Sequence, residues 1–238
     1  MPVHFVMNLD SLNPQQREAV TDVEGPFVIL AGAGTGKTRV ITSRVAYLIE
    51  KCGVPPEQIL AVTFTNKAAR EMQERVSKLI PKKMSVEKGK KAPKPTISTF
   101  HSLCVRILRL YIDRLGYKNN FVIYDESDQL STLRKIMSHI LTGDEKFDVK
   151  VVQSLLSRFK NNGPESLRDQ PASLVAFAQH VQRQYESALR ACNAVDFDDL
   201  ILLVLKLFEE HPDVLAACQN RYRYVMVDEY QDTNASQF

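Results

Sequence analysis

The segment at 31–39, AGAGTGKTR, constrains the fold of this chain more than any other feature. It follows the apolar run 27–30 and opens onto a helical pattern, so its glycines are predicted to lie at a turn between a strand and a helix. Such glycines let the backbone bend and direct successive N–H groups at phosphates, and the start of the helix adds a partial positive charge. The predicted phosphate-binding residues are Ala31, Gly32, Ala33, Gly34, Thr35, Gly36, Lys37 and Thr38.

Lys37 and Thr38 decide which kind of phosphate loop this is. Lys37 is expected to reach the outer phosphates of a nucleotide, and the Thr38 hydroxyl to bind Mg²⁺. Because both residues follow the last glycine directly, a dinucleotide-binding turn is disfavoured. One position departs from the general pattern, since Ala31 stands where the first glycine is usual.

A second segment, VMVDEYQDTN at 225–234, supplies the carboxylates that ATP hydrolysis needs. Its apolar run 225–227 ends in Asp228, a candidate metal ligand, and Glu229, a candidate base for the attacking water. Paired acids at a strand end are often only solvated loop residues. Together with the phosphate loop they predict a site for ATP and Mg²⁺.

Composition places the chain among ordinary globular proteins. It has 238 residues, enough for one large or two smaller domains. No apolar run approaches the roughly 18–20 residues of a membrane span, and the N-terminus lacks a basic region followed by an apolar stretch, so a cytoplasmic protein is expected. The cysteines are far apart without a CxxC pair, and Cys52, Cys104, Cys192 and Cys218 are predicted to be reduced packing residues.

Positive charge is concentrated in one region. Residues 66–118 hold 14 of the 31 Lys and Arg but only 4 of the 28 Asp and Glu. A polyanion such as DNA would prefer this region, although a merely solvated surface is an equally good interpretation of charge alone. Within it, the lysine-rich segment 81–95 is expected to form a mobile loop.

The order of elements predicts the fold class. Strands are predicted at 26–31, 58–63, 96–99 and 223–228, and each of the first three is followed by a helix, at 37–51, 66–79 and 101–115 respectively. From about 125 only helices are predicted, at 126–141, 149–161, 173–191, 197–210 and 212–220. Alternating strands and helices indicate a parallel sheet covered on both faces. We therefore expect an α/β, RecA-like P-loop NTPase domain at 1–118 and 192–238, interrupted by an all-helical insertion at 119–191.

Six segments, in order, resemble the N-terminal motifs of the UvrD/Rep/PcrA family of superfamily 1 DNA helicases. They are LNPQQREAV at 12–20, AGAGTGKTRV at 31–40, FTNKAAREM at 64–72, STFHSLC at 98–104, DFDDLI at 196–201 and VDEYQDTN at 227–234. The resemblance implies that Gln16 reads the adenine edge and that the flat guanidinium of Arg39 lies against the adenine. It also implies that Gln231 couples the ATP site to DNA.

The resemblance further implies contacts to single-stranded DNA at two strand ends, from Phe64, Thr65, Asn66, Thr99, Phe100 and His101. An exposed aromatic at such a position can stack on any base, a contact worth roughly 1–3 kcal/mol. The residues alone leave Phe64 open as a core side chain and His101 as a packing or capping residue. DFDDL could hold a metal by composition, but a helix start with Phe197 and Leu200 packed inward is preferred.

The resemblance thus implies the ATP- and single-stranded-DNA-binding N-terminal part of a 3′ to 5′ DNA helicase of repair or replication, acting on single strands and their junctions with duplex. Family members continue with a second RecA-like domain and arginine fingers, so this fragment is expected to hydrolyse ATP negligibly and to bind it weakly. Two alternatives stay open. One is a nucleotide-gated DNA-binding module, and the other is the N-terminal part of a helicase–nuclease.

Overall fold

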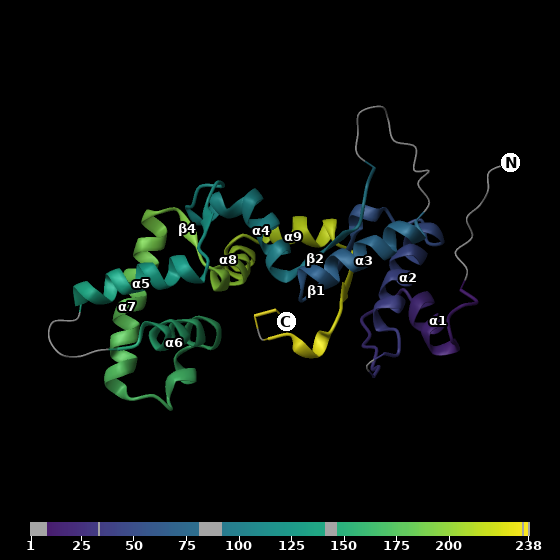
Figure 1. Cartoon of the computed structure of the whole chain (residues 1–238). Helices are drawn as coiled ribbons and strands as arrows, with labels where there is room; N and C mark the ends of the chain where they lie inside the picture. The colour runs from purple at the N-terminus through teal and green to yellow at the C-terminus, as the bar shows by residue number, and fades with distance from the viewer. Residues whose placement is uncertain (1–8, 33, 81–91, 141–146, 235, 238) are drawn as a thin grey trace. The chain divides into compact units, whose positions relative to one another are not determined.

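A computed structural model describes residues 9–32, 34–80, 92–140, 147–234 and 236–237 of the chain (Figure 1). The chain divides into two compact units, 1–100 with 216–232 and 101–215 with 233–238. The first unit holds a parallel sheet with helices, and the second is mostly helical. The predicted α/β class with a parallel sheet is confirmed.

The sheet of the first unit has three parallel strands. β1 (Ile59–Thr63) lies between β2 (Thr96–Thr99) and β5 (Tyr224–Val227), with Leu60 opposite Thr96 on one side and Val225 on the other (Figure 1). Asp228 extends the ladder, because its N–H donates to the carbonyl of Val62 over 2.9 Å. Parallel strands end at the same edge, so the residues that follow β1, β2 and β5 come together there.

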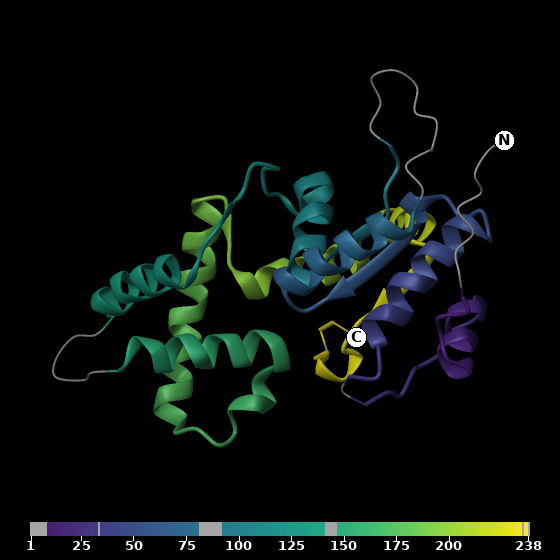
Figure 2. The ribbon, with the colours of Figure 1, turned by 45° about the vertical axis from the view of Figure 1, so that its right-hand side comes forward.

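Two helices pack on one face of this sheet, α2 (Lys37–Glu50) and α3 (Asn66–Leu79), as Figure 2 shows. Their shared core contains Val45, Leu48, Ile59, Ala61, Met72, Val76 and Ile97. α1 (Pro14–Thr21) packs on the other side of α2 through Leu12 and Val20, which meet Val40 and Ala46. The helices predicted at 37–51 and 66–79 are therefore confirmed to within one residue.

The strand predicted at 26–31 is wrong. The structure describes all six residues and they form no strand, with Val28 and Leu30 exposed to 67% and 93%. A strand requires a neighbour whose backbone groups can pair with its own. In the described sheet β1 is flanked by β2 and β5, and the run 26–31 pairs with neither.

The second unit begins with α4 (Phe100–Tyr111) and the short helix η2 (Ile112–Leu115). It continues with α5 (Glu126–Ile140), α6 (Val149–Asn162), η3 (Pro164–Leu167), α7 (Ala172–Ala191) and α8 (Phe197–Glu210), and α9 (Pro212–Arg221) leads back to the first unit. Two-residue strands, β3 (Val122–Ile123) and β4 (Ala194–Val195), pair in parallel and were not predicted, because they are too short to show a period. None of the described helices combines the length and hydropathy that a transmembrane segment needs.

The core of the second unit lies between α5, α6 and α7. Its most buried members are Leu133, Val152, Leu155, Val181, Tyr185 and Leu189. Helical spacing produces the apolar stripe on each helix, and burying these stripes against one another stabilises the unit.

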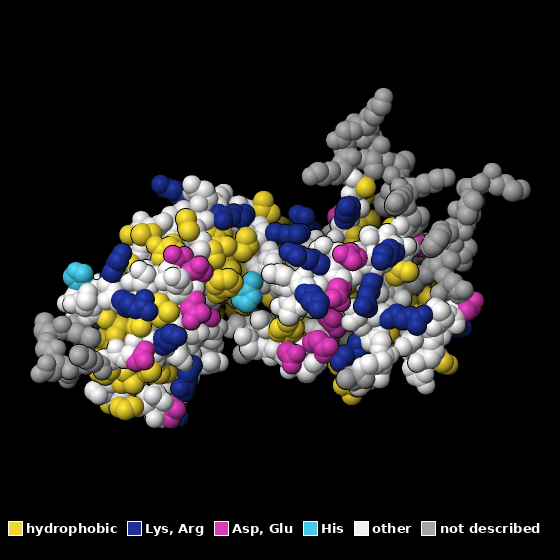
Figure 3. Space-filling model, in the orientation of Figure 1, with side chains coloured by type: hydrophobic (Ala, Val, Ile, Leu, Met, Phe, Trp, Pro, Cys, Tyr) yellow, Lys and Arg dark blue, Asp and Glu magenta, His cyan; other side chains and the backbone are white. Residues whose placement is uncertain are grey.

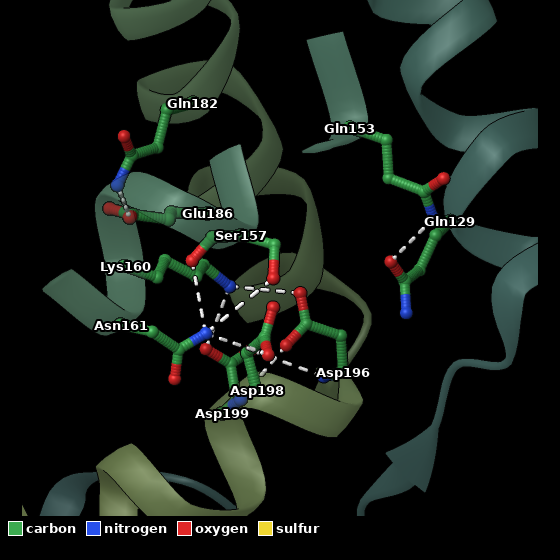
Figure 4. A network of polar contacts seen from close by, with 10 residues as sticks. All are labelled: Gln129, Gln153, Ser157, Lys160, Asn161, Gln182, Glu186, Asp196, Asp198 and Asp199. Atoms are coloured by element: carbon green, nitrogen blue, oxygen red, sulfur yellow. Dashed lines mark hydrogen bonds and ion pairs between the residues drawn. The ribbon is translucent and has the colours of Figure 1, made fainter. Parts of the chain in front are cut away.

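A buried ionic network joins the end of α6 to the start of α8 (Figure 4). Lys160 Nζ lies 2.9 Å from an oxygen of Asp196 and 2.8 Å from one of Asp199, and the Lys160 side chain is only 6% exposed. Asp196 caps α8 by accepting from the N–H of Asp199, and Asn161 donates to Asp198 over 2.9 Å. The acids of DFDDL thus start a helix, as predicted, and neutralise a lysine.

Charge compensation explains why Lys160 tolerates burial. Burial alone lowers the pKa of its ammonium group, but the charges of Asp199 and Asp196 and hydrogen bonds to both outweigh that effect, so the pKa lies above its ordinary value. Lys160 therefore stays charged at neutral pH.

The cysteines occupy two kinds of environment. Cys104 is buried, and burial raises the pKa of its thiol to about 12. Cys218 is half-buried, and burial raises its pKa as well. The prediction of packing residues is wrong for Cys52 and Cys192, which are exposed.

Replacing Lys160 by Ala is expected to reduce the free energy of unfolding by about 3–5 kcal/mol, because Asp196 and Asp199 would stay buried without their cation. Urea denaturation at pH 7 measures the change. Lys206→Ala is the matched control, since Lys206 Nζ lies 3.7 Å from Glu210 at the surface and should cost less than about 0.5 kcal/mol. Equal losses for the two variants would contradict the prediction.

Candidate functional site

The phosphate loop is held by its own backbone and by Thr35. The Thr35 hydroxyl donates to the carbonyl of Gly32 over 2.7 Å. Gly34 and Gly36 have φ angles of 76° and 92°, which favour glycine, and Gly36 is the residue that precedes α2. Among the described residues, no side chain caps this helix start. Its first N–H groups therefore lack intrahelical partners and are available to an anion.

Gln16 joins α1 to the phosphate loop. Its side-chain oxygen accepts from the N–H of Asn13, which closes a capping box at the start of α1. Its Nε2 donates to the carbonyl of Thr35 over 2.8 Å. A Cβ at Gly36 would lie 3.0 Å from the same nitrogen. The structure thus brings the predicted adenine-reading residue against the predicted phosphate loop.

The two motifs from opposite ends of the chain meet at an ion pair. Lys37 Nζ lies 3.1 Å from Glu229 Oε2, and the same oxygen accepts from Gln231 Nε2 over 2.5 Å. Glu229 has a φ of 53°, a left-handed conformation that costs a non-glycine residue of order 1–3 kcal/mol. Strain of this kind is found where a structure fixes a functional side chain.

The adjacent carboxyls titrate differently. Hydrogen bonding from Gln231, then the hydrogen bond and charge of Lys37, holds the pKa of Glu229 below its ordinary value. Asp228 is buried, and burial together with the charge of Glu229 raises its pKa. Environments that push neighbouring carboxyls in opposite directions are typical of catalytic sites.

These residues fit a nucleotide and a divalent cation. An uncapped helix start behind left-handed glycines suits a phosphate, and Lys37 adds a positive charge beside it. Oxygen ligands are what Mg²⁺ prefers, and Asp228 and the half-buried Thr38 offer them. Arg39 is exposed on the first turn of α2 and Ala31 is half-buried, whereas Ala33 lies outside the described residues.

Two aromatic rings lie together at the carboxyl edge of the sheet. Phe64 follows β1 and Phe100 follows β2, and their ring centroids are 5.6 Å apart at 59°. Both side chains are half-buried, so part of each stays accessible to solvent. Thr65 caps α3 by accepting from the N–H of Ala68, and Thr99 is buried at the end of β2, while Asn66 is exposed.

His101 belongs to the second unit and packs against Phe197, a residue that was predicted to face inward. Its ring lies edge-on to Phe197, with centroids 5.7 Å apart. Burial lowers the pKa of His101, against the opposing charge of Asp198. Leu200 is buried as predicted, but Phe197 is 49% exposed. Phe197 is the first residue of α8, and the buried residues of this helix begin at Leu200.

Exposed basic residues lie along α3. Lys67, Arg70, Arg75 and Lys78 are exposed on this helix, with Glu71 and Glu74 between them. Around α3, Figure 3 shows Lys and Arg side chains close together with Asp and Glu side chains interspersed. The predicted lysine-rich loop falls mostly outside the described residues, at 81–91, and 92–95 are irregular.

Sequence reasoning missed Arg44. It lies on α2 among buried positions and is itself only 8% exposed. The available signal was a single arginine inside an otherwise apolar helical stripe, but its partners depend on the tertiary fold. The exposure of the Phe197 ring was not predicted either, because it also depends on the tertiary fold.

Comparison with known proteins gives one family and several relatives. The family model described as UvrD/REP helicase N-terminal domain matches residues 12–238. The chain is 43% identical to "ATP-dependent DNA helicase PcrA" of Staphylococcus aureus (strain Mu50) over 236 residues, and 44% identical to the protein of that name in Bacillus subtilis (strain 168) over 244 residues. These alignments cover 97% and 99% of the chain but only 31% and 32% of the relatives.

Gly36→Ala is expected to weaken the hydrogen bond between Gln16 and Thr35, because the new Cβ would lie 3.0 Å from Gln16 Nε2 and push it aside. Gly25→Ala is the matched control, since Gly25 also has a positive φ of 72°, but a Cβ added there would lie within 4 Å of no other described residue beyond its chain neighbours. Both variants should lose about 1 kcal/mol of stability from the left-handed backbone. Only Gly36→Ala should weaken binding of a fluorescent ATP analogue, and equal affinities would contradict this.

Proposed function

The chain belongs to the UvrD/REP helicase N-terminal domain family, and from that premise we propose that it is the ATP- and single-stranded-DNA-binding N-terminal part of an ATP-dependent DNA helicase. In the longer protein this part would drive 3′ to 5′ movement along one strand, up to junctions with duplex. The relatives named as ATP-dependent DNA helicases support the proposal over 97% or more of this chain.

One observation carries the proposal: Lys37 lies 3.1 Å from Glu229 although the two residues come from opposite ends of the chain. The ion pair brings together two side chains that phosphoryl transfer from ATP uses, a lysine for the phosphates and a carboxylate for the attacking water. The loop at 31–38 would hold the phosphates, Asp228 and Thr38 would hold Mg²⁺, and Gln16 with Arg39 would hold the adenine.

Bound Mg²⁺ would supply charge neutralisation for the phosphates. In the structure Lys37 Nζ forms an ion pair with the Glu229 carboxylate. Nucleotide binding would draw Lys37 to the phosphates, and Glu229 would then be able to accept a proton from water. Gln231 donates to the same oxygen, so this exchange would alter its hydrogen bond and couple the ATP site to the DNA-binding residues.

The DNA track would begin at the edge of the sheet where β1 and β2 end. Phe64 and Phe100 already contact each other there, and a base could stack on the accessible part of Phe64. Thr65, Asn66, Thr99 and His101 would support the strand, and the basic residues of α3 would attract its phosphates.

We also propose that the RecA-like core comprises 1–118 and 192–238 and that 119–191 form an insertion, a narrower segment than the second compact unit at 101–215 with 233–238. The core of α5, α6 and α7 supports an insertion that folds around its own apolar residues. The C-terminal domains of the longer protein would complete the ATP site.

Single-stranded DNA binding tests the proposed track. Fluorescence anisotropy with a short oligonucleotide across a salt series should show salt-sensitive binding, which Phe64→Ala weakens by roughly 1–3 kcal/mol through loss of base stacking. Lys37→Ala should bind DNA like the parent chain, because the phosphate loop is a separate site. If binding is salt-sensitive but Phe64→Ala does not weaken it, the DNA binds to basic side chains alone and the stacking proposal is wrong.

ATP hydrolysis by the 238-residue chain is expected to be negligible, with or without DNA. The family's arginine fingers lie beyond the part that this chain matches, and in other phosphoryl-transfer enzymes an arginine finger is worth about 10³–10⁵ in rate. A phosphate-release assay measures the rate, with Glu229→Gln as the control for contaminating ATPases. A DNA-stimulated rate that Glu229→Gln removes would show that the prediction is wrong.

A further inference from the structure

Arg44 is a buried cation that touches the end of α1. It lies on α2 and is 8% exposed, and its Nη1 donates to the carbonyl oxygens of Ala19, 2.9 Å away, and of Asp22. Both carbonyls belong to the C-terminal end of α1, where the helix dipole is negative and the last carbonyls lack intrahelical partners. The guanidinium thus serves as the cap that α1 needs.

The same guanidinium also contacts the segment that leads into the phosphate loop. Its central carbon lies 4.4 Å from the centroid of the Phe27 ring. A planar cation over a ring face is a directional contact, unlike the apolar contact between Val20 and Val40. One side chain therefore fixes α1 and the start of the run 27–32 against α2.

Keeping Arg44 charged in this place has a free-energy cost. Burial lowers its pKa, and the charge of Asp22, followed by smaller contributions from Cys52 and Tyr224, opposes that effect. An apolar residue would fill the same space without desolvating a cation. The directional contacts to two carbonyls and a ring are what such a residue could not provide.

α1 is held at both ends by elements of the nucleotide site. At its C-terminal end Arg44 binds the carbonyls, and at its N-terminal end Gln16 Nε2 donates to Thr35 in the phosphate loop. Figure 2 shows α1 lying beside α2, whose first residue is Lys37. An eight-residue helix is marginal in isolation, so its placement depends on these contacts.

We propose that Arg44 is a positioning residue for adenine recognition, which sets where Gln16 lies relative to the phosphate loop. The inference rests on the proposed ATP site and assigns part of its base recognition to a residue that touches no nucleotide. Lysine at this position keeps the charge but lacks the planar, multiply donating head, so it would let α1 shift while the phosphate loop stays on α2.

The test separates the adenosine part of binding from the phosphate part. Competition against a fluorescent ADP analogue gives affinities of the 238-residue chain for ATP and for inorganic tripolyphosphate. Arg44→Lys is expected to lower the affinity for ATP about three- to tenfold and to change the affinity for tripolyphosphate by less than about twofold. Gln16→Ala should have the same two effects. The double variant should be no weaker than Gln16→Ala alone, because both changes remove one interaction.

Arg17→Lys is the matched control, since Arg17 is an exposed arginine on α1 that pairs with Asp10 over 3.8 Å, and it should bind both ligands like the parent. An unchanged ratio of ATP to tripolyphosphate affinity in Arg44→Lys, equal loss of both ligands, or additive losses in the double variant would overturn the inference. If Arg44→Lys does not fold, Phe27→Leu decides. A reduced ratio supports the role of the guanidinium contact and an unchanged ratio overturns it.

Lys37→Ala distinguishes this inference from the proposed function. It should weaken both ATP and tripolyphosphate, because Lys37 would contact phosphate in each. If Lys37→Ala leaves the affinities for both ligands unchanged, the proposed ATP site is overturned, and the role of Arg44 with it. Sensitivity to Lys37→Ala combined with an unchanged ratio in Arg44→Lys would overturn the role of Arg44 alone.

Discussion

Parallel pairing of β5 with β1 is the constraint on which the site depends. β1 is followed directly by Phe64 and β5 by Asp228 and Glu229, so the register of the two strands decides where the aromatic and the carboxylates stand. The N–H of Asp228 is itself bonded to β1, through the carbonyl of Val62. A slip of one residue would turn each side chain to the other face of the sheet and separate Glu229 from Lys37. The ion pair between these residues is therefore a product of strand register.

Much of this arrangement could be predicted from the sequence, and the exceptions have physical causes. The helices at 66–79 and 197–210 and the strand at 96–99 have the predicted bounds, because strong periodicity and clear caps or breakers define them. The run 27–30 has the composition of a strand, but pairing is a tertiary property and none of the described strands pairs with it. Phe197 follows the apolar period of α8 and still faces solvent, since periodicity cannot show where a packed neighbour ends. The contacts between Gln16 and Thr35 and between Lys37 and Glu229 form only when the sheet and helices are assembled, so local sequence patterns do not predict them.

Two buried cations show two ways of meeting the same electrostatic demand. Lys160 lies between two carboxylates, which keep it charged and fasten α6 to the cap of α8. Arg44 has carbonyl oxygens and a ring face as partners, and burial lowers its pKa. The first arrangement neutralises a full charge and resists disruption, whereas the second relies on orientation. Each unit of the chain thus uses one buried basic side chain to fix a helix end.

The exposed run 27–30 has a consequence for the behaviour of this chain in concentrated solution. Val28 and Leu30 face solvent, and Val225 on β5 is more than half exposed, while β5 has a neighbour on only one side within the described sheet. An open strand edge and an unpaired, β-prone apolar segment each offer backbone groups for pairing between molecules. Self-association of the isolated chain should therefore start at this edge, where the run of one molecule adds to the sheet of another, and a charged residue at Val28 would act as a gatekeeper against it.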